Sequence, residues 1–488
     1  MSNSNYKKHN SKGGYSKRNS KNDNYTEKNN FNVNNNNSTN KITNVDNDIK
    51  KDKDIKKKNI KVIIIISIFM IIFALLLIIG IINKKEKEYQ YQLKLEQEKE
   101  TQRLEKIANI KNHYGLYVKS DKEAILYNDA EQEIGKIGSN VELSLEDIEP
   151  TENTKYFNIS NFDKEYYISY EDVFPIDELS EIDKRYQEYI VFNENIITTD
   201  ITTFYDENDN LIYEFNKSFN LPIIIKEDNK YGVEYNGRLL YVLKDEVVET
   251  KYNYNTDKHN SSGVGVLNYH AFYDKNNAEE RAGCTTIICH STEQFKTHLD
   301  YFKEHNILTL KMKELEMYID GKIQLPKSVL ITIDDGVKEE HAIEMLTEYQ
   351  MYGTIFLITS WVSDISNYHI TEYIELHSHT HNMHNVGDCP TGQGGGIQCL
   401  SEEYIQDDLK KSRDVLNGTT YFCYPFYEYN DYSTKMLKQA GFTMAFIGEN
   451  WYGDNLVHTG ANKFKLNRFV ITTYTTLSDF DDYFGQIK

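Results

Sequence analysis

The sequence lacks an excess of basic residues and lacks closely paired cysteines. Its 55 Lys and Arg stand against 75 Asp and Glu, for a formal net charge of −20 at pH 7. This charge argues against nucleic acid as a partner, because phosphate backbones are bound by positive surfaces. The 5 cysteines include no C-x-x-C pair, which argues against a cysteine-based metal site.

An odd number of cysteines leaves at least one thiol free. Cys284 and Cys289 lie in one predicted loop, and Cys423 ends a predicted strand. Cys389 and Cys399 flank a glycine-rich segment beside a histidine cluster. We expect these two to form a disulfide that closes the segment, while the sequence leaves the other pairings open.

The first 82 residues are organised around one apolar run. Residues 1–59 are rich in Asn, Lys and Ser with almost no branched apolar residues, which predicts a disordered tail. Residues 62–82 carry no charge, so we expect a transmembrane helix over residues 60–82. Lysines crowd its N-terminal flank, which places the N-terminus in the cytoplasm and the rest outside. The run is too long for a signal peptide and no A-x-A-like site follows, so we expect an uncleaved single-pass anchor in the plasma membrane.

Three further units are expected before the C-terminal domain. Residues 83–112 contain no glycine and are rich in Glu, Lys, Gln and Leu, which predicts a helical stalk. Residues 113–180 and 188–252 each hold short alternating segments separated by turns, the pattern of small β-barrels. They resemble bacterial SH3-like modules, for which wall binding and a rigid spacer are both open roles.

Two adjacent acids end the most informative stretch, SVLITIDDG, at residues 328–336. The apolar run before them predicts a buried parallel strand. In alternating β/α barrels, catalytic groups lie where strands end. Two carboxylates at such a tip repel each other unless a cation or a proton separates their roles. Asp334 and Asp335 are therefore candidates for a base and a metal ligand.

A histidine cluster follows the next informative strand, in EYIELHSHTHNMH at residues 372–384. Clustered histidines with a carboxylate nearby are a common set of ligands for a catalytic divalent metal such as zinc. The cluster consists of four of the chain's 14 histidines: His377, His379, His381 and His384.

Together these residues resemble the polysaccharide deacetylase (NodB-homology, carbohydrate esterase family 4-like) family. Its first motif, T-F-D-D-G, is present as TIDDG at residues 332–336. The resemblance covers about residues 263–488 and implies a distorted (β/α) barrel in the α/β class. It also implies Asp334 as the general base, Asp335 as a metal ligand, and one divalent metal, for which we expect Zn²⁺.

The family's second motif supplies two metal histidines, and two alignments fit. His379 with His384 leaves four residues between the ligands, as in the poly-N-acetylglucosamine deacetylase branch. His377 with His381 leaves three, as in the peptidoglycan and chitin branches. We prefer the first, because it puts Ser378 before the ligand and leaves His377 at the last inward position of the strand.

The third motif resembles residues 419–430, TTYFCYPFYEYN. The resemblance implies that Pro425 and Tyr427 line the acetyl pocket and that a backbone N–H near Tyr427 binds the oxyanion. The family often has an arginine two residues before this proline, where this chain has Cys423. We therefore expect Arg468, in KLNRFVI, to orient the base.

The general acid has two candidates. Tyr269-His270, at the end of a predicted strand, resembles the Tyr-His pair of the poly-N-acetylglucosamine branch, in which the histidine is the acid. His458, in Leu-Val-His, matches the L-x-H motif of other branches. We expect His270 to be the acid.

The resemblance implies hydrolysis of the N-acetyl group of N-acetylglucosamine units, with release of acetate. We expect the substrate to be peptidoglycan, in the wall of a Gram-positive bacterium, with exported poly-N-acetylglucosamine as the alternative. A wall-binding scaffold with a degenerate enzyme domain is the alternative of another class. The sequence leaves the oligomeric state open.

Overall fold

The computed structural model describes most of the chain, in two compact units that divide after Gln97. The predicted tail over residues 1–47 lies outside the described residues. Nothing is described of the side chains of residues 48–57. The described residues are 48–488 except 161, 163–164, 253–258, 363–364, 369 and 450–453.

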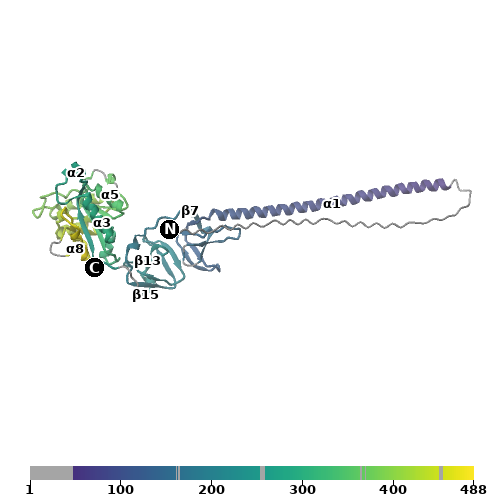
Figure 1. Ribbon diagram of the computed structural model, residues 1–488. Coiled ribbons are helices and arrows are strands. Elements are labelled where there is room, and N and C mark those ends of the chain that lie inside the picture. The colour runs from purple at the N-terminus through teal and green to yellow at the C-terminus, as the bar shows by residue number, and fades with distance from the viewer. Residues whose placement is uncertain are drawn as a thin grey trace, which may run out of the picture. The chain divides into compact units, whose positions relative to one another are not determined.

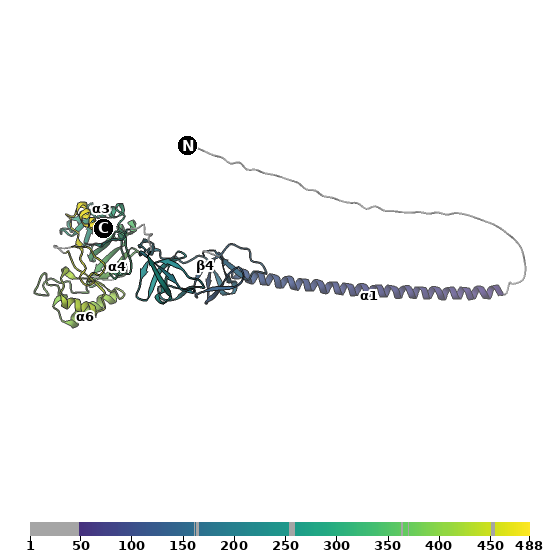
Figure 2. The ribbon, with the colours of Figure 1, turned by 90° about the horizontal axis from the view of Figure 1, so that it is seen from below.

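One helix, α1 (Asp48–Asn112), contains both the predicted span and the predicted stalk (Figures 1 and 2). The helix is long and apolar enough to cross a membrane by length and composition from Lys58 onward. The expectation of disorder is corrected for residues 48–59, which are helical. These residues contain no Gly or Pro, and extending a helix costs less free energy than nucleating one.

In the described part of the region after α1 there are fifteen short strands, and their pairs are antiparallel. Hairpins recur, as in β5–β6 and β13–β14, and along β5 and β6 buried side chains alternate with half-buried ones. The strands are β1 (Tyr117–Ser120), β2 (Ala124–Tyr127), β3 (Glu133–Ile137), β4 (Glu142–Ser144), β5 (Tyr156–Ile159), β6 (Tyr166–Ser169), β7 (Val173–Ile176), β8 (Glu194–Thr198), β9 (Thr202–Tyr205), β10 (Leu211–Phe215), β11 (Asn220–Pro222), β12 (Ile225–Lys226), β13 (Lys230–Tyr235), β14 (Arg238–Leu243) and β15 (Val247–Tyr252).

The two predicted β modules share one sheet, which corrects the expectation of separate units. Strand β3 pairs with β10, and this pairing joins the two groups into a nine-stranded sheet. Glycines permit the close approach: a Cβ on Gly135 would lie 2.2 Å from the Glu214 carbonyl oxygen, and one on Gly138 would lie 1.8 Å from that of Leu211. Side chains of both groups also form one hydrophobic cluster. The likeness to SH3-like modules stays a prediction.

The segment between the strand groups also binds the C-terminal domain. Arg185 donates to both carboxylate oxygens of Glu314, at 2.6 and 3.0 Å, and the Tyr189 hydroxyl donates to the same carboxylate at 3.0 Å. Ile190 forms a β-bridge with Gln324. These contacts hold the segment against helix α4 (Met312–Ile319) and against the loop that follows it.

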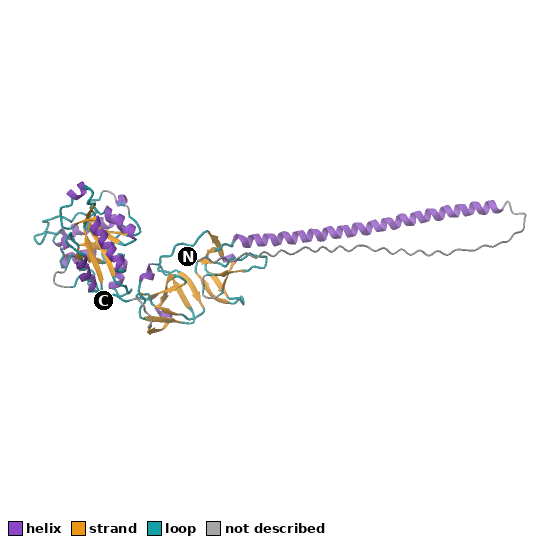
Figure 3. Cartoon of the chain, viewed as in Figure 1, coloured by secondary structure: helices purple, strands orange, loops and turns teal. Residues whose placement is uncertain are grey.

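The C-terminal domain is a parallel barrel in which strands alternate with helices (Figure 3). The strand order is β24-β23-β22-β21-β20-β16-β25, and β19 pairs with β20. Leu466 bridges to Phe446 in β24, and β25 pairs with β16, so residues 466–470 close the ring. The main strands are β16 (Val264–Tyr269), β19 (Leu308–Thr309), β20 (Ser328–Asp335), β21 (Gly353–Leu357), β22 (Ile374–Ser378), β23 (Tyr421–Cys423), β24 (Met444–Phe446) and β25 (Phe469–Val470), with β17 (Ala271–Tyr273) and β18 (Cys289–Ser291) as a separate pair.

Helices cover the outside of this barrel. Helix α3 begins at an N-cap, Ser291, whose side chain accepts from the Gln294 N–H, and it buries Phe295, Leu299 and Phe302 on one face. This is the apolar stripe of a helix packed on a sheet. The helices are α2 (Ala278–Ala282), α3 (Thr292–Glu304), α5 (Glu340–Tyr349), α6 (Glu402–Val415), α7 (Asp431–Gln439) and α8 (Leu477–Gly485).

The period of two along β20 decides which side chains face inward. Val329, Ile331 and Ile333 join the hydrophobic cluster between strands and helices, whereas Leu330 joins the cluster inside the barrel. Asp334 shares the inward parity of Leu330 and lies at the carboxyl end of the strand. The fold therefore delivers this carboxylate to the mouth of the barrel.

Candidate active site

Asp335 and two histidines bring their ligand atoms together at the mouth of the barrel. Oδ1 of Asp335 lies 3.4 Å from Nε2 of His379 and 3.4 Å from Nε2 of His384. All three ligand atoms lie within 4.8 Å of one another. Asp335 has φ 75° and Gly336 has φ 74°, so the backbone turns sharply as β20 ends. One carboxylate and two imidazoles form a donor set suited to a divalent metal such as zinc.

A backbone contact orients one of these histidines. Nδ1 of His379 lies 2.8 Å from the Cys423 carbonyl oxygen, to which a protonated Nδ1 donates. Nε2 then keeps its lone pair toward the other two ligands, as metal-binding histidines generally require. Burial lowers the pKa of His384 to about 4, which favours the neutral imidazole that a metal needs. The donors therefore fit a divalent cation.

The other two histidines of the cluster lie elsewhere. His377 occupies an inward position of β22, two residues below His379, where its Nδ1 lies 2.7 Å from Thr419 Oγ1. Burial lowers the pKa of His377 to about 3. Nδ1 of His381 lies 3.0 Å from Thr359 Oγ1. Among the described residues, the structure does not bring this pair together with Asp335 as a group of candidate ligands.

Asp334 is held by Arg468, the arginine expected to take the place of the missing motif residue. The guanidinium donates to Oδ1 at 2.7 Å and to Oδ2 at 2.8 Å, and both side chains are buried. Burial acts to raise the pKa of Asp334, but the positive charge of Arg468 holds that pKa well below its usual range. Asp334 is therefore ionised at neutral pH.

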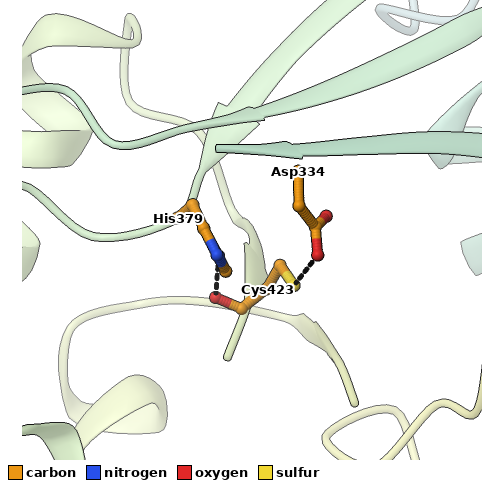
Figure 4. A group of neighbouring side chains, drawn as sticks. All are labelled: Asp334, His379 and Cys423. Atoms are coloured by element: carbon orange, nitrogen blue, oxygen red, sulfur yellow. Dashed lines mark hydrogen bonds between the residues drawn. The ribbon is translucent and has the colours of Figure 1, made fainter. Parts of the chain in front are cut away.

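Cys423 contacts the same carboxylate, and Figure 4 shows it between Asp334 and His379. Its Sγ lies 3.3 Å from Asp334 Oδ2 and 3.0 Å from Nη2 of Arg468. Asp334, His379 and Cys423 are close enough to hold a cation. Because Arg468 binds both oxygens of Asp334, a positive charge already occupies that position, and the group is better explained as support for the base.

The two candidate acids lie at opposite ends of the barrel. His270 follows β16 and lines the same cleft as the metal triad. Burial lowers its pKa, while the charges of Asp334 and Asp335 oppose that shift. His458 instead contacts the Ser262 carbonyl oxygen before β16 begins, at 2.7 Å, so it lies at the amino end of the strand. The alternative of His458 as the acid is contradicted by this position.

The third motif forms a tight turn beside the triad. Phe426 and Tyr427 both have positive φ, 57° and 62°, and the Phe426 ring lies 4.4 Å from that of His384. The Tyr427 N–H donates to the Tyr424 carbonyl at 3.1 Å, so it is already used inside the turn. The expected oxyanion donor near Tyr427 therefore stays a prediction, and it would have to be an N–H other than that of Tyr427 itself.

These groups line one cleft of about 960 Å³. Sequence reasoning missed several residues that line this cleft or contact its lining. Asn268 is fully buried and its Oδ1 accepts from the Tyr427 hydroxyl at 2.6 Å; its inward position in β16 was the available signal. Gln393 and Glu449 also line the cleft, and nothing in their local sequence marks them.

The disulfides agree with the expected Cys389–Cys399 pair, whose Cα atoms are 5.8 Å apart. Cys284 pairs with Cys289. Cys423 is the free, buried thiol.

Comparison with known proteins identifies the domain. Residues 322–445 match the family model "Polysaccharide deacetylase". The chain is 28% identical over 207 residues to a poly-beta-1,6-N-acetyl-D-glucosamine N-deacetylase of Staphylococcus aureus, covering 37% of this chain and 67% of that protein. It is 24% identical to the Staphylococcus epidermidis protein of the same name, covering 46% and 86%. A solved de-N-acetylase from Aggregatibacter actinomycetemcomitans is 19% identical, with a TM-score of 0.38, covering 45% of this chain and 99% of that one. The family match confirms the prediction of a polysaccharide deacetylase domain, an enzyme acting on amide bonds.

Proposed function

We propose that this chain removes N-acetyl groups from a poly-β-1,6-N-acetylglucosamine polymer. The observation that carries this is the Asp335–His379–His384 triad beside the Arg468-bound Asp334 in one cleft. The substrate is supported by the printed activity of the relatives. Four residues between the histidines, and the position of His270 in the cleft, point the same way. The peptidoglycan substrate expected from the sequence has less support than this alternative.

Asp335, His379 and His384 would hold the divalent metal, for which Zn²⁺ suits the donors. When bound, such a cation lowers the pKa of a water and polarises the acetamide carbonyl. Asp334, kept ionised by Arg468, would take the proton of the attacking water. The Phe426 N–H would donate to the developing oxyanion.

His270 would complete the reaction by protonating the departing sugar amine. Its ring lies in the cleft with both carboxylates nearby, and its Nδ1 is buried without a hydrogen-bond partner among the described residues. The C–N bond then breaks, giving acetate and a free amine. Neither a serine nor a cysteine nucleophile is required.

We place the catalytic domain outside the plasma membrane, anchored by residues 60–82. The lysines before the apolar run support this orientation. The two disulfides of the barrel support it independently, because disulfides persist in oxidising, extracytoplasmic compartments.

The proposal is tested by acetate release from the full chain in detergent micelles loaded with Zn²⁺. Poly-β-1,6-N-acetylglucosamine and purified peptidoglycan are supplied in parallel. The proposal expects release from the first polymer, abolished in Asp335→Asn and retained in Asp414→Asn, a surface control on α6. Release from peptidoglycan alone would restore the substrate expected from the sequence, and release from neither would refute the activity.

A further inference from the structure

The glycine-rich loop between Cys389 and Cys399 is fastened by one carboxylate. Glu428 accepts from the Gly395 N–H at 2.8 Å, from Nε2 of Gln398 at 2.8 Å, and also from the Gln393 N–H. The disulfide closes the base of the loop. Glu428 directly follows the turn Pro425–Tyr427, whose Phe426 and Tyr427 line the cleft, so this carboxylate ties the loop to the wall of the cleft.

The glycines of the loop permit this contact. Gly392 has φ +57°, and a Cβ there would lie 1.8 Å from Oε1 of Glu428. A Cβ on Gly395 would make a tight contact as well, at 3.2 Å from Oε2. Any larger residue at position 392 would displace the carboxylate. A second anchor, Nδ2 of Asn430, donates to the Gln398 carbonyl at 3.1 Å.

The fastened loop presents one polar side chain to the cleft. Gln393 lines the cleft together with Phe426 and Tyr429. Within the described residues, its side-chain amide has no hydrogen-bond partner. A primary amide offers two donors and one acceptor, which suits the hydroxyl and acetamido groups of a neutral sugar. The adjoining rings of Phe426 and Tyr429 offer apolar faces of the kind that sugar rings pack against.

We propose that this loop binds the sugar unit next to the one being deacetylated, with Gln393 touching the substrate. Glu428 is then a positioning residue that holds Gln393 in place before substrate arrives. Such preorganisation improves binding, because the loop does not lose conformational freedom on complex formation. The inference rests on the proposed function and adds a second sugar-binding position to it.

The test uses the full chain loaded with Zn²⁺ and β-1,6-linked N-acetylglucosamine oligomers of increasing length. Gln393→Ala and Glu428→Gln are compared with Thr391→Ala, a control in the same loop that does not line the cleft. Loss of one or two neutral hydrogen bonds predicts a KM for longer oligomers raised roughly 3- to 10-fold with kcat nearly unchanged. The control should keep the wild-type KM.

Oligomer binding is measured in parallel by calorimetry, with melting temperature as the check on folding. A weaker Kd for Gln393→Ala supports the loop even if the wild type releases no acetate, in which case only the proposed reaction fails. An unchanged KM and Kd in Gln393→Ala overturns the inference, whether or not Glu428→Gln folds. A fall in kcat alone also overturns it, because that would place the loop in the chemistry instead of in binding.

Discussion

Replacing Asp334 by Asn removes one buried negative charge while nearly keeping the shape of the side chain. In the wild type both carboxylate oxygens accept from Arg468, at 2.7 and 2.8 Å, and both side chains are buried. The amide can accept at one position only, and its NH₂ group faces a second donor on the guanidinium. The variant therefore leaves a buried guanidinium without its counter-charge.

Two magnitudes follow from this geometry. Breaking one side of a buried ion pair costs about 3–5 kcal/mol, which lowers the melting temperature of a domain of this size class by roughly 6–20 °C. Loss of a general base lowers the rate by about 10²–10⁴. The metal should stay bound, because Asp335 and the two histidines are unchanged.

The stability difference should depend on pH in one direction. The folded-state pKa of Asp334 is depressed, so its contribution is present above the unfolded-state value of about 3.9 and is lost as pH falls toward the folded value. The gap in melting temperature between wild type and Asp334→Asn should be constant from about pH 5 to 8 and narrow below about pH 4.

Melting curves, metal analysis and acetate release decide the matter, with Asp414→Asn as the control. Asp414 is 62% exposed and pairs with Lys410 on the surface of α6, so its loss should cost only a few tenths of a kcal/mol. Equal melting temperatures at pH 7 would refute the energetic argument. Turnover close to wild type with metal bound would remove Asp334 from the role of base.

His384→Ala should lose the metal and the activity, whereas His381→Ala should keep both, since the His381 side chain bonds a threonine instead; the reverse result in a metal analysis would restore the other register. His270→Ala should keep the metal but lose the basic limb of the pH–rate profile, which reports deprotonation of the acid. His458→Ala, at the other end of the barrel, should leave that profile unchanged, and a flattened limb there would reassign the acid. Cys399→Ser should lower the free energy of unfolding, measured in urea, by roughly 2–3 kcal/mol, because the unfolded chain gains conformational entropy when the cross-link is removed. An unchanged midpoint of the urea transition would mean that Glu428 alone holds the loop.

The site was predictable where strand periodicity fixes the direction of a side chain. Asp334 lies at an inward position of a buried strand, and His379 follows the next informative strand, so the two had to meet at one end of a parallel barrel. Arg468 was predictable because the arginine that the family often has two residues before the proline is absent here, where the chain has Cys423. Another arginine was therefore needed to bind the base. The alternative of His458 as the acid was wrong because the L-x-H motif does not reveal where the histidine lies in the fold. An antiparallel bridge between Val457 and Val264 holds it at the amino end of β16.

Contacts between distant loops were not predictable. Glu428 reads as a solvated acid after a turn, and only the folded chain brings Gly392 against it. The joined sheet was missed for a similar reason. The alternation of apolar and polar residues along β3 indicates a strand but does not identify the strand with which it pairs. In the structure that strand is β10, from the second strand group.

The pairing of β3 with β10 makes residues 113–252 indivisible. If one strand group were expressed without the other, β3 or β10 would be left with a row of unsatisfied backbone N–H and C=O groups. Such open edges recruit strands from other molecules, so either half expressed alone should self-associate. A soluble fragment of this enzyme should therefore retain both strand groups or omit both.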